Sequence, residues 1–400
     1  MTKLLTLTFL AVALLVIACK NPSNDQSNLK ALALAVDSVT GEPYLFTDSS
    51  GVAYISWIEK GKKESILSFS KLNDGSWSKP TVISSGDNWF VNWADYPVLA
   101  TDGGKNMIAH FLERSEKGKY TYDIKFITSA DGGKTWGTSK ILNEDGKKAE
   151  HGFVSLVPHK GNYFVAWLDG RNAVQEGEGG HGKGHHGQMT LRGASIGKDG
   201  TKSAEWELDN RVCDCCQTAS AITTNGPVVI YRDRSDDEIR DMSIVRLVNG
   251  QWTEPKIISP DNWKIAGCPV NGPRVDAKGN NLSVAWFSSP GKKGQVNVIF
   301  SHDGGINFGS AIRIDEGEAI GRVDIVMLDD KTVMVSWMEG AAIKAAKVHD
   351  DGTKEPSIII ASSSQSRSSG FPQMTKSGNS ILFAWTDDKL KKIITALLAL

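Results

Sequence analysis

The sequence contains seven copies of a short apolar segment that centres on an aromatic residue. The aromatic positions are Trp57, Phe111, Trp167, Tyr231, Trp286, Trp337 and Trp385. Successive positions are 48 residues apart at the closest (Trp337 to Trp385) and 64 at the widest (Trp167 to Tyr231). A repeat of this length that holds several short strands is typical of the blades of a β-propeller. The repeat therefore predicts an all-β chain folded as one propeller.

Each repeat also has an internal order. An inner strand, often entered through proline as at Pro97, is followed by the aromatic strand, a third strand and a fourth strand that begins near tryptophan. This order predicts four-stranded antiparallel blades, seven in the favoured count and six if one unit is an appendage. The seventh unit has three strands before Leu400, and we expect the apolar residues 32–36 to add its outer strand and close the ring.

The N-terminus predicts export. Lys3 precedes an apolar run over residues 4–17, which is short for a membrane span and suits a signal peptide. Residues 16–19, Val-Ile-Ala-Cys, resemble the bacterial lipobox, which implies a signal peptide over residues 1–18 and lipidation of Cys19. An ordinary signal peptide, with Cys19 incidental, is the alternative. Residues 19–28 are polar and predict a tether, leaving residues 29–400 for the propeller.

These features predict a lipoprotein of the bacterial cell envelope, attached to a membrane through Cys19. Lys20, rather than aspartate, follows that cysteine and favours the outer membrane by resemblance to the sorting rule of enteric bacteria; the periplasmic and external faces both stay open. The net charge of −1 gives no electrostatic reason to expect a nucleic-acid partner.

Two glycine-rich turns identify the type of propeller. The residues concerned are Ser129, Asp131, Gly133, Thr135 and Trp136 in the first turn, and Ser301, Asp303 and Gly305 in a degenerate second copy. They resemble the Asp-box of the sialidase/BNR-repeat superfamily. The resemblance implies turns between third and fourth strands, on the face opposite the ligand site, so these residues identify a fold rather than a chemistry.

The opposite face is expected to gather the unusual polar residues. Loops between second and third strands, and crossings from one blade to the next, all emerge there. Residues 180–187, rich in glycine and histidine, and the charged residues 232–241 belong to such loops, whereas residues 211–218 and 267–272 are crossings. We call the region where these segments are expected to meet the mouth, and we predict a functional site in it.

Four cysteines besides Cys19 fall in two of these crossings: Cys213, Cys215, Cys216 and Cys268. Disulfides would suit an exported protein, although bonding the adjacent Cys215 and Cys216 would be strained. Thiolates joined by His181, His185 or His186 would instead suit Cu(I) or Zn(II). Thiol redox chemistry is a third alternative.

The superfamily resemblance also implies a test for sialidase chemistry. Sialidases hold the substrate carboxylate with three arginines, and they use a tyrosine with a glutamate and an aspartic acid. Only Arg322 matches the arginine motif, if Asp324 takes the place of its proline. Further weak candidates for a catalytic site are Arg171, Arg232, Arg234, Arg240 and Asp95.

These weaker candidates have simpler alternatives. The charges of residues 232–241 alternate in sign and could pair with one another on a solvated loop. Asp95 lies two residues after Trp93 and could help to stack a sugar, or could equally belong to packing between blades.

Three function hypotheses follow. The first is a lipid-anchored propeller that binds a ligand, with copper or zinc as candidates, at a face rich in cysteine, histidine and arginine. The second is an exo-sialidase-type glycoside hydrolase that acts on glycans. The third is a non-catalytic scaffold for interaction with other molecules.

Overall fold

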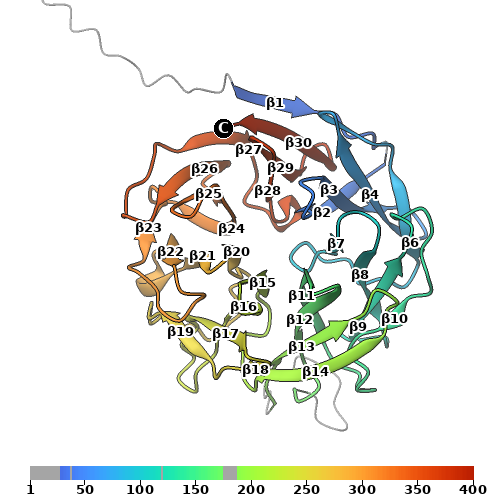
Figure 1. Ribbon diagram of the computed structural model, residues 1–400, viewed down its shortest axis with the longest axis horizontal. Helices are drawn as coiled ribbons and strands as arrows, with labels where there is room; N and C mark the ends of the chain where they lie inside the picture. The colour runs from blue at the N-terminus through green and yellow to red at the C-terminus, as the bar shows by residue number, and fades with distance from the viewer. Residues whose placement is uncertain (1–27, 37, 119, 174–186) are drawn as a thin grey trace, which may run out of the picture.

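The protein folds as a seven-bladed β-propeller. The computed structural model describes residues 28–36, 38–118, 120–173 and 187–400. Seven antiparallel sheets stand around one axis and confirm the all-β prediction and the favoured blade count (Figure 1). The predicted signal peptide, Cys19 and the three histidines of residues 180–187 lie outside the described residues. No helix in the described ranges is long and apolar enough to cross a membrane.

The first three blades follow the chain in order. Blade one contains β2 (Thr40–Thr47), β3 (Ala53–Lys60), β4 (Ser65–Asn73), β5 (Ser76–Trp77) and β6 (Thr81–Gly86). Blade two contains β7 (Leu99–Thr101), β8 (Met107–Arg114), β9 (Tyr122–Ser129) and β10 (Lys140–Ile141). Blade three contains β11 (His151–His159), β12 (Asn162–Asp169), β13 (Thr190–Ile196) and β14 (Lys202–Asp209).

The middle blades repeat this plan. Blade four contains β15 (Ala219–Ile222), β16 (Pro227–Arg232), β17 (Met242–Val248), β18 (Gln251–Trp252) and β19 (Lys256–Ser259). Blade five contains β20 (Arg274–Lys278), β21 (Asn281–Ser288), β22 (Gln295–Ser301) and β23 (Ile312–Arg313), with the 3-10 helix η2 (Pro290–Lys292) between β21 and β22. In blades one and four the outer strand is split into two pieces, and both pieces pair with the third strand.

The last two blades complete the circle. Blade six contains β24 (Ala319–Met327), β25 (Thr332–Glu339), β26 (Ala342–His349) and β27 (Ile358–Ser362). After the 3-10 helix η3 (Arg367–Ser369), blade seven contains β28 (Gln373–Ser377), β29 (Ser380–Asp387), β30 (Lys392–Ala399) and β1 (Leu29–Leu32).

The ring closes because the first strand of the chain pairs with the last. β1 runs antiparallel to β30, and Leu29 lies opposite Leu398 (Figure 1). The prediction of closure is confirmed, but the predicted strand, residues 32–36, was wrong by three positions. Leu34 and Val36 instead pack against the apolar core between blades seven and one, which draws them away from the sheet edge.

The aromatic anchors of the repeat form the core between blades. Trp57, Trp167, Trp286 and Trp337 lie on second strands and are at most 1% exposed. A second strand has a sheet neighbour on each side and another blade against each face, so its side chains are enclosed in both directions. This double burial explains why the anchors formed the clearest pattern in the sequence.

The first Asp-box turn joins β9 to β10, the third and fourth strands of its blade, and packs against the neighbouring blade. The Asp131 carboxylate accepts hydrogen bonds from the Ser129 hydroxyl and the Thr135 backbone N–H, both at 2.9 Å. Gly133 has a φ of +80°, and a Cβ there would come within 2.4 Å of Phe69 in blade one. Trp136 meets the same Phe69 ring edge-on, so the turn joins two blades. Ser301, Asp303 and Gly305 repeat the hydrogen bonds between β22 and β23.

Thr395 on β30 links the two ends of the ring and gives a test of closure. Its hydroxyl donates to the Leu32 carbonyl at 2.8 Å and accepts from the Trp77 indole N–H at 3.0 Å. Thr395→Val keeps the shape and removes both bonds, so we expect the free energy of unfolding to fall by about 1–3 kcal/mol. Denaturant titration measures this change.

Thr386→Val on β29 is the matched control for that experiment. Thr386 is also buried, and its hydroxyl makes no hydrogen bond to any residue of the described ranges. An equal loss of stability in the two variants would contradict a special role for Thr395 in closure.

Candidate functional site

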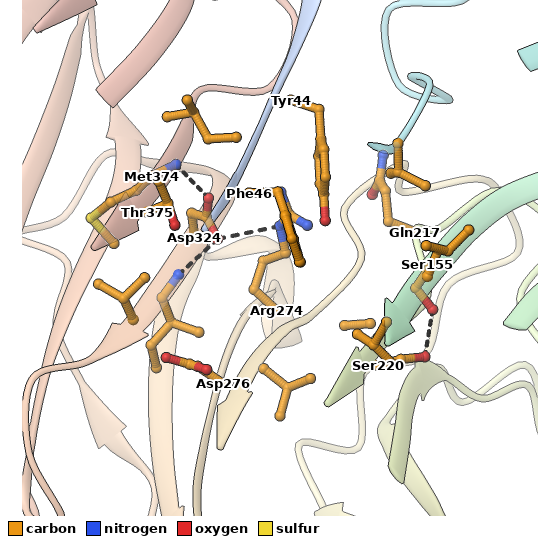
Figure 2. Close-up of a pocket in the computed structure, with 18 of the residues that line it drawn as sticks. Tyr44, Phe46, Ser155, Gln217, Ser220, Arg274, Asp276, Asp324, Met374 and Thr375 are labelled. Atoms are coloured by element: carbon orange, nitrogen blue, oxygen red, sulfur yellow. Dashed lines mark hydrogen bonds and ion pairs between the residues drawn. The ribbon is translucent and has the colours of Figure 1, made fainter. Parts of the chain in front are cut away.

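The axis of the propeller contains a cavity of about 390 Å³. Its wall is built by inner strands and the segments leading into them, and side chains that line it include Tyr44, Ser155, Gln217, Arg274 and Asp324 (Figure 2). Inner strands face the axis because the blades of a propeller are arranged radially around a central channel.

The carboxylates of this wall hold neighbouring blades together. Asp95 accepts the backbone N–H of Phe153 in blade three at 2.8 Å, and Asp276 accepts that of Met327 in blade six at 2.7 Å. Asp324 accepts the N–H of Met374 in blade seven at 2.6 Å (Figure 2). Burial raises the pKa of all three carboxyl groups. The candidate acids Asp95 and Asp324 are thus engaged in the architecture.

Arg274 adds a positive charge to the cavity wall, which Lys278 and Lys376 also line. Its Nε lies 3.4 Å from an Asp324 oxygen, its guanidinium also bonds to the Gln373 side chain, and it lies over the Tyr96 ring (Figure 2). These contacts pair the one arginine of the cavity wall with a carboxylate of the same wall.

The two cysteine-bearing crossings lie side by side at the mouth. The Gln217 side chain accepts the Gly272 N–H at 2.9 Å and donates to the Ala94 carbonyl at 2.5 Å. A Cβ on Gly272 would come within 2.3 Å of the Gln217 backbone, so only glycine permits this approach. The contact brings residues 211–218 and 267–272 together, as the topology predicted.

Three of the thiols form a cluster. The sulfurs of Cys213, Cys215 and Cys216 all lie within 4.8 Å of one another, and Cys213 Sγ is 3.5 Å from Cys216 Sγ. The Cys268 thiol, on the neighbouring crossing, lies outside this group of three, although it interacts electrostatically with Cys215. All four are free thiols, since a disulfide requires about 2.05 Å between sulfurs. Cys213 and Cys216 are buried, Cys215 is half-buried and Cys268 is exposed.

The thiols differ strongly in acidity. Burial raises the pKa of Cys213 to about 11. Burial also opposes ionisation of Cys216, but hydrogen bonds from Cys213 and Cys215, together with the charge of Arg232, hold its pKa well below the usual range. The hydrogen bond from Cys215 lowers the pKa of Cys268. The cluster therefore stabilises thiolate charge at Cys216 and Cys268.

Arginines of residues 232–241 surround the thiols. Arg232 donates to the carbonyls of Asn271, Arg240 and Phe287, and it lies over the Trp263 ring.

Two N–H donor groups of Arg240, which lies beside Cys213, lack hydrogen-bond acceptors among the described residues. It is 2% exposed and donates through Nη2 to Glu238, whereas its buried Nε and Nη1 reach no hydrogen-bond acceptor. Its charge interacts with the Cys213 thiol.

Arg234 forms ion pairs with Asp214 at 3.1 Å and with Glu238 at 2.8 Å. The second pair supports the alternative that the charges of residues 232–241 pair with one another.

Arg322, the motif-level candidate for a carboxylate clamp, points away from the cavity. It lies at a β-bulge with a φ of +52° and over the Trp93 ring. Its Nη atoms donate to the Ser369 hydroxyl at 2.8 Å and to backbone carbonyls of residues 365, 366 and 370. Burial lowers its pKa to about 10. These four acceptors fix the loop between β27 and β28.

Arg171 lies in a separate network around His151. Its guanidinium is 2.8 Å from Asp169, 3.2 Å from Asp145 and 3.2 Å from Glu205. His151 is fully buried; its Nε2 lies 2.9 Å from Asp145 and its Nδ1 lies 3.1 Å from the Tyr122 carbonyl. Both ring nitrogens thus face acceptors, which requires a protonated ring. Asp145, His151 and Asp169 could geometrically hold a cation, but Arg171 already supplies that charge.

Sequence patterns missed two further residues beside the thiols. The Tyr122 hydroxyl donates to Glu150 at 2.9 Å. The pair lies near the thiols, because the charge of Glu150 opposes ionisation of Cys268 and the charge of Cys215 raises the pKa of Tyr122. Burial raises the pKa of Tyr122 well above its usual value, so the phenol stays protonated. No spacing in the sequence could have indicated this pair, because its members come from adjacent blades.

Comparisons with known proteins establish similarity of fold. No family model matches the sequence, and no curated protein does either. An ulvan lyase of polysaccharide lyase family PL25 is 14% identical over 80% of each chain, with a TM-score of 0.50. A Dyadobacter fermentans protein of unknown function is 14% identical over 93% of this chain and 99% of its own, with a TM-score of 0.48. Hadza microbial sialidase Hz136 is 14% identical over 75% of this chain and 63% of its own, at 0.43. The similarity to the ulvan lyase supports the fold alone and transfers no activity.

The His151 network predicts a pH dependence of stability. Burial opposes the charged ring, but the hydrogen bond to Asp145 and the charge of Asp169 outweigh it and raise the pKa of His151. Stability from this pair is therefore complete below about pH 6.5, the unfolded pKa, and is lost as pH rises through the folded pKa. Denaturant unfolding at pH 6 to 9 should show this decline.

His151→Gln tests the source of the decline. We expect the variant to lose about 3–5 kcal/mol at pH 6, because buried carboxylates lose a partner, and to lose less as pH rises. His302→Gln, which replaces an exposed histidine, should follow the wild-type curve. Parallel curves for wild type and His151→Gln would refute the assignment.

Proposed function

We propose that this protein is a lipid-anchored propeller of the cell envelope that binds a soft metal ion at Cys213, Cys215, Cys216 and Cys268. The convergence of three sulfurs, with a fourth free thiol on the neighbouring crossing, supports the proposal most directly. Thiolates are the ligands preferred by Cu(I) and Zn(II).

The electrostatic setting supports the same conclusion. A buried group of thiolates is costly unless positive charge lies nearby. Arg232 adds its charge next to Cys216, and Arg240 adds its charge next to Cys213. These two charges would offset part of the cost of ionising the buried sulfurs when a metal binds.

Two further parts of the proposal are the lipid anchor at Cys19 and additional histidine ligands. Lipidation at Cys19 would tether the propeller to a membrane, with the outer membrane favoured, and would place the thiols near its surface. His181, His185 and His186 stay candidates for additional ligands from the loop that follows Arg171.

Glycoside hydrolysis receives less support from the same geometry. A sialidase clamp needs arginines directed at one free space. Arg322 is bonded to a loop, Arg274 is paired with Asp324, and Arg171 belongs to the His151 network. We therefore do not propose an arginine clamp. If the thiols bound no metal, the hypothesis of a non-catalytic scaffold for interaction would be favoured.

Metal content and free-thiol count on one sample test the proposal. The chain from Lys20 onward keeps all strands of the propeller and should be purified anaerobically without chelator. We expect close to one equivalent of copper or zinc by elemental analysis, with thiols that react after the metal is removed. Cys213→Ser combined with Cys216→Ser should reduce the metal to background, because two buried ligands are lost.

His302→Gln is the control for adventitious binding, because it removes an exposed imidazole far from the cysteines in sequence. It should leave the metal content unchanged. A chain with no metal and no free thiol would contain only disulfides, and that result would overturn the proposal.

A further inference from the structure

We infer that the occupant is Cu(I) held by the three sulfurs of Cys213, Cys215 and Cys216, and that Cys268 is the thiol through which it exchanges with a Cu(I)-carrying thiol in solution. This inference rests on the proposed function. It assigns different roles to the four cysteines, which a four-thiolate zinc site would not do.

The burial of the cysteines separates one thiol from the other three. Cys213 and Cys216 are 1% and 2% exposed, and Cys215 packs against the core of blades two to four. Cys268 is exposed on the other crossing, which the Gln217–Gly272 hydrogen bond holds against the first, and its sulfur lies outside the group of three. An ion bound by the first three is enclosed, whereas Cys268 remains available to a partner.

The sulfur spacing fits a three-coordinate ion. A metal about 2.3 Å from three sulfurs in a plane separates those sulfurs by about 4 Å. The three sulfurs already lie within 4.8 Å of one another, with one pair at 3.5 Å, so small side-chain rotations suffice. Zn(II) in structural sites takes four ligands and would need Cys268 withdrawn from solvent. Cu(I) requires only the three enclosed sulfurs.

The unused donors of Arg240 also indicate charge at the sulfurs. Nε and Nη1 are buried without an acceptor beside Cys213, which is costly unless they face a charged sulfur. Three thiolates around a monovalent ion leave a net charge of minus two. Arg232 offsets part of this negative charge. Its donors bond to backbone carbonyls, and within the described residues none of them bonds to a carboxylate.

The exchange step balances without an oxidant. The Cys268 thiolate forms a bond to Cu(I) while the bond from Cu(I) to the carrier thiolate breaks. Cys215 next replaces Cys268, and Cys213 and Cys216 complete the set. Each cysteine thiol that binds the ion releases its proton to water, and copper stays Cu(I) throughout.

Competition with a chromophoric Cu(I) chelator tests the division of roles in the chain from Lys20 onward. Cys268→Ser should change Cu(I) affinity by less than about threefold. The same variant should lower Zn(II) affinity about 10–100-fold and slow transfer of Cu(I) from glutathione about tenfold or more. Cys215→Ser should lower both affinities. X-ray absorption should count three sulfurs around copper in wild type and in Cys268→Ser.

Three results would overturn the inference. Equal loss of Cu(I) affinity in Cys268→Ser and Cys215→Ser would indicate four equivalent ligands. Unchanged zinc affinity or unchanged transfer rate in Cys268→Ser would remove the role of that thiol. Tight zinc binding by all four cysteines in wild type, with weak copper binding, would keep the proposed function and reject this inference, whereas binding of neither metal would reject both.

Arg240→Gln tests the charge argument separately. We expect Cu(I) affinity about 10–100-fold lower, as for other partners just outside a metal's ligands. Arg240→Lys should recover part of it, because the charge returns without the planar geometry. Arg313→Gln removes a positive charge from blade five, where Arg313 pairs with Asp315, and should change affinity by less than about threefold. Equal effects of Arg240→Gln and Arg313→Gln would contradict a specific role for Arg240.

Discussion

The structure depends on how the inner edges of seven sheets are satisfied around a narrow axis. Each innermost strand has a sheet neighbour on one side and none on the axial side, so its backbone N–H groups there need other acceptors. Asp95, Asp276 and Asp324 fill this role for the following blade. Burying these carboxylates is unfavourable, as their raised pKa values indicate. Fixing one blade against the next offsets that cost.

Similar hydrogen bonds, from backbone N–H groups of one blade to a side chain of the blade before it, shape the mouth. Where blades four, five and six meet, amides replace the carboxylates: Gln217 accepts the N–H of Gly272, and Asn271 accepts that of Arg322. These bonds hold the crossing that carries Cys268 against the crossing that carries the other three cysteines. The cysteine cluster is therefore a product of the contacts between blades, and it requires no strand or helix of its own.

The sequence allowed prediction of those features that repeat or that follow from propeller topology. The anchors such as Trp167 repeat because second strands are buried on both faces, and the turn at Asp131 recurs because it needs a fixed set of bonds. Convergence of the cysteines followed from the side of the ring on which crossings emerge. The direction of Arg322 could not be predicted, because a bulge with a positive φ turns its side chain toward a loop 44 residues further along the chain. The pairing of Tyr122 with Glu150, and of His151 with Asp145, also escaped prediction, since it depends on the register of neighbouring blades.

Buried charge is compensated differently in the axial cavity and at the mouth, although Asp95 Oδ2 in the cavity wall also lacks a hydrogen-bond partner among the described residues. In the cavity, Asp324 is bonded to two backbone N–H groups and lies next to Arg274, so its charge is largely satisfied (Figure 2). At the mouth, Arg240 keeps two buried donors without acceptors and four thiols lie together without disulfides. A folded protein tolerates buried unsatisfied donors when something charged completes them. Ionised sulfur can complete the Arg240 donors, and sulfur remains ionised in a buried place most readily when it is bound to a metal. The proposed metal would therefore account for the arginine and the cysteines together, because ionised sulfur ligands would accept from the Arg240 donors.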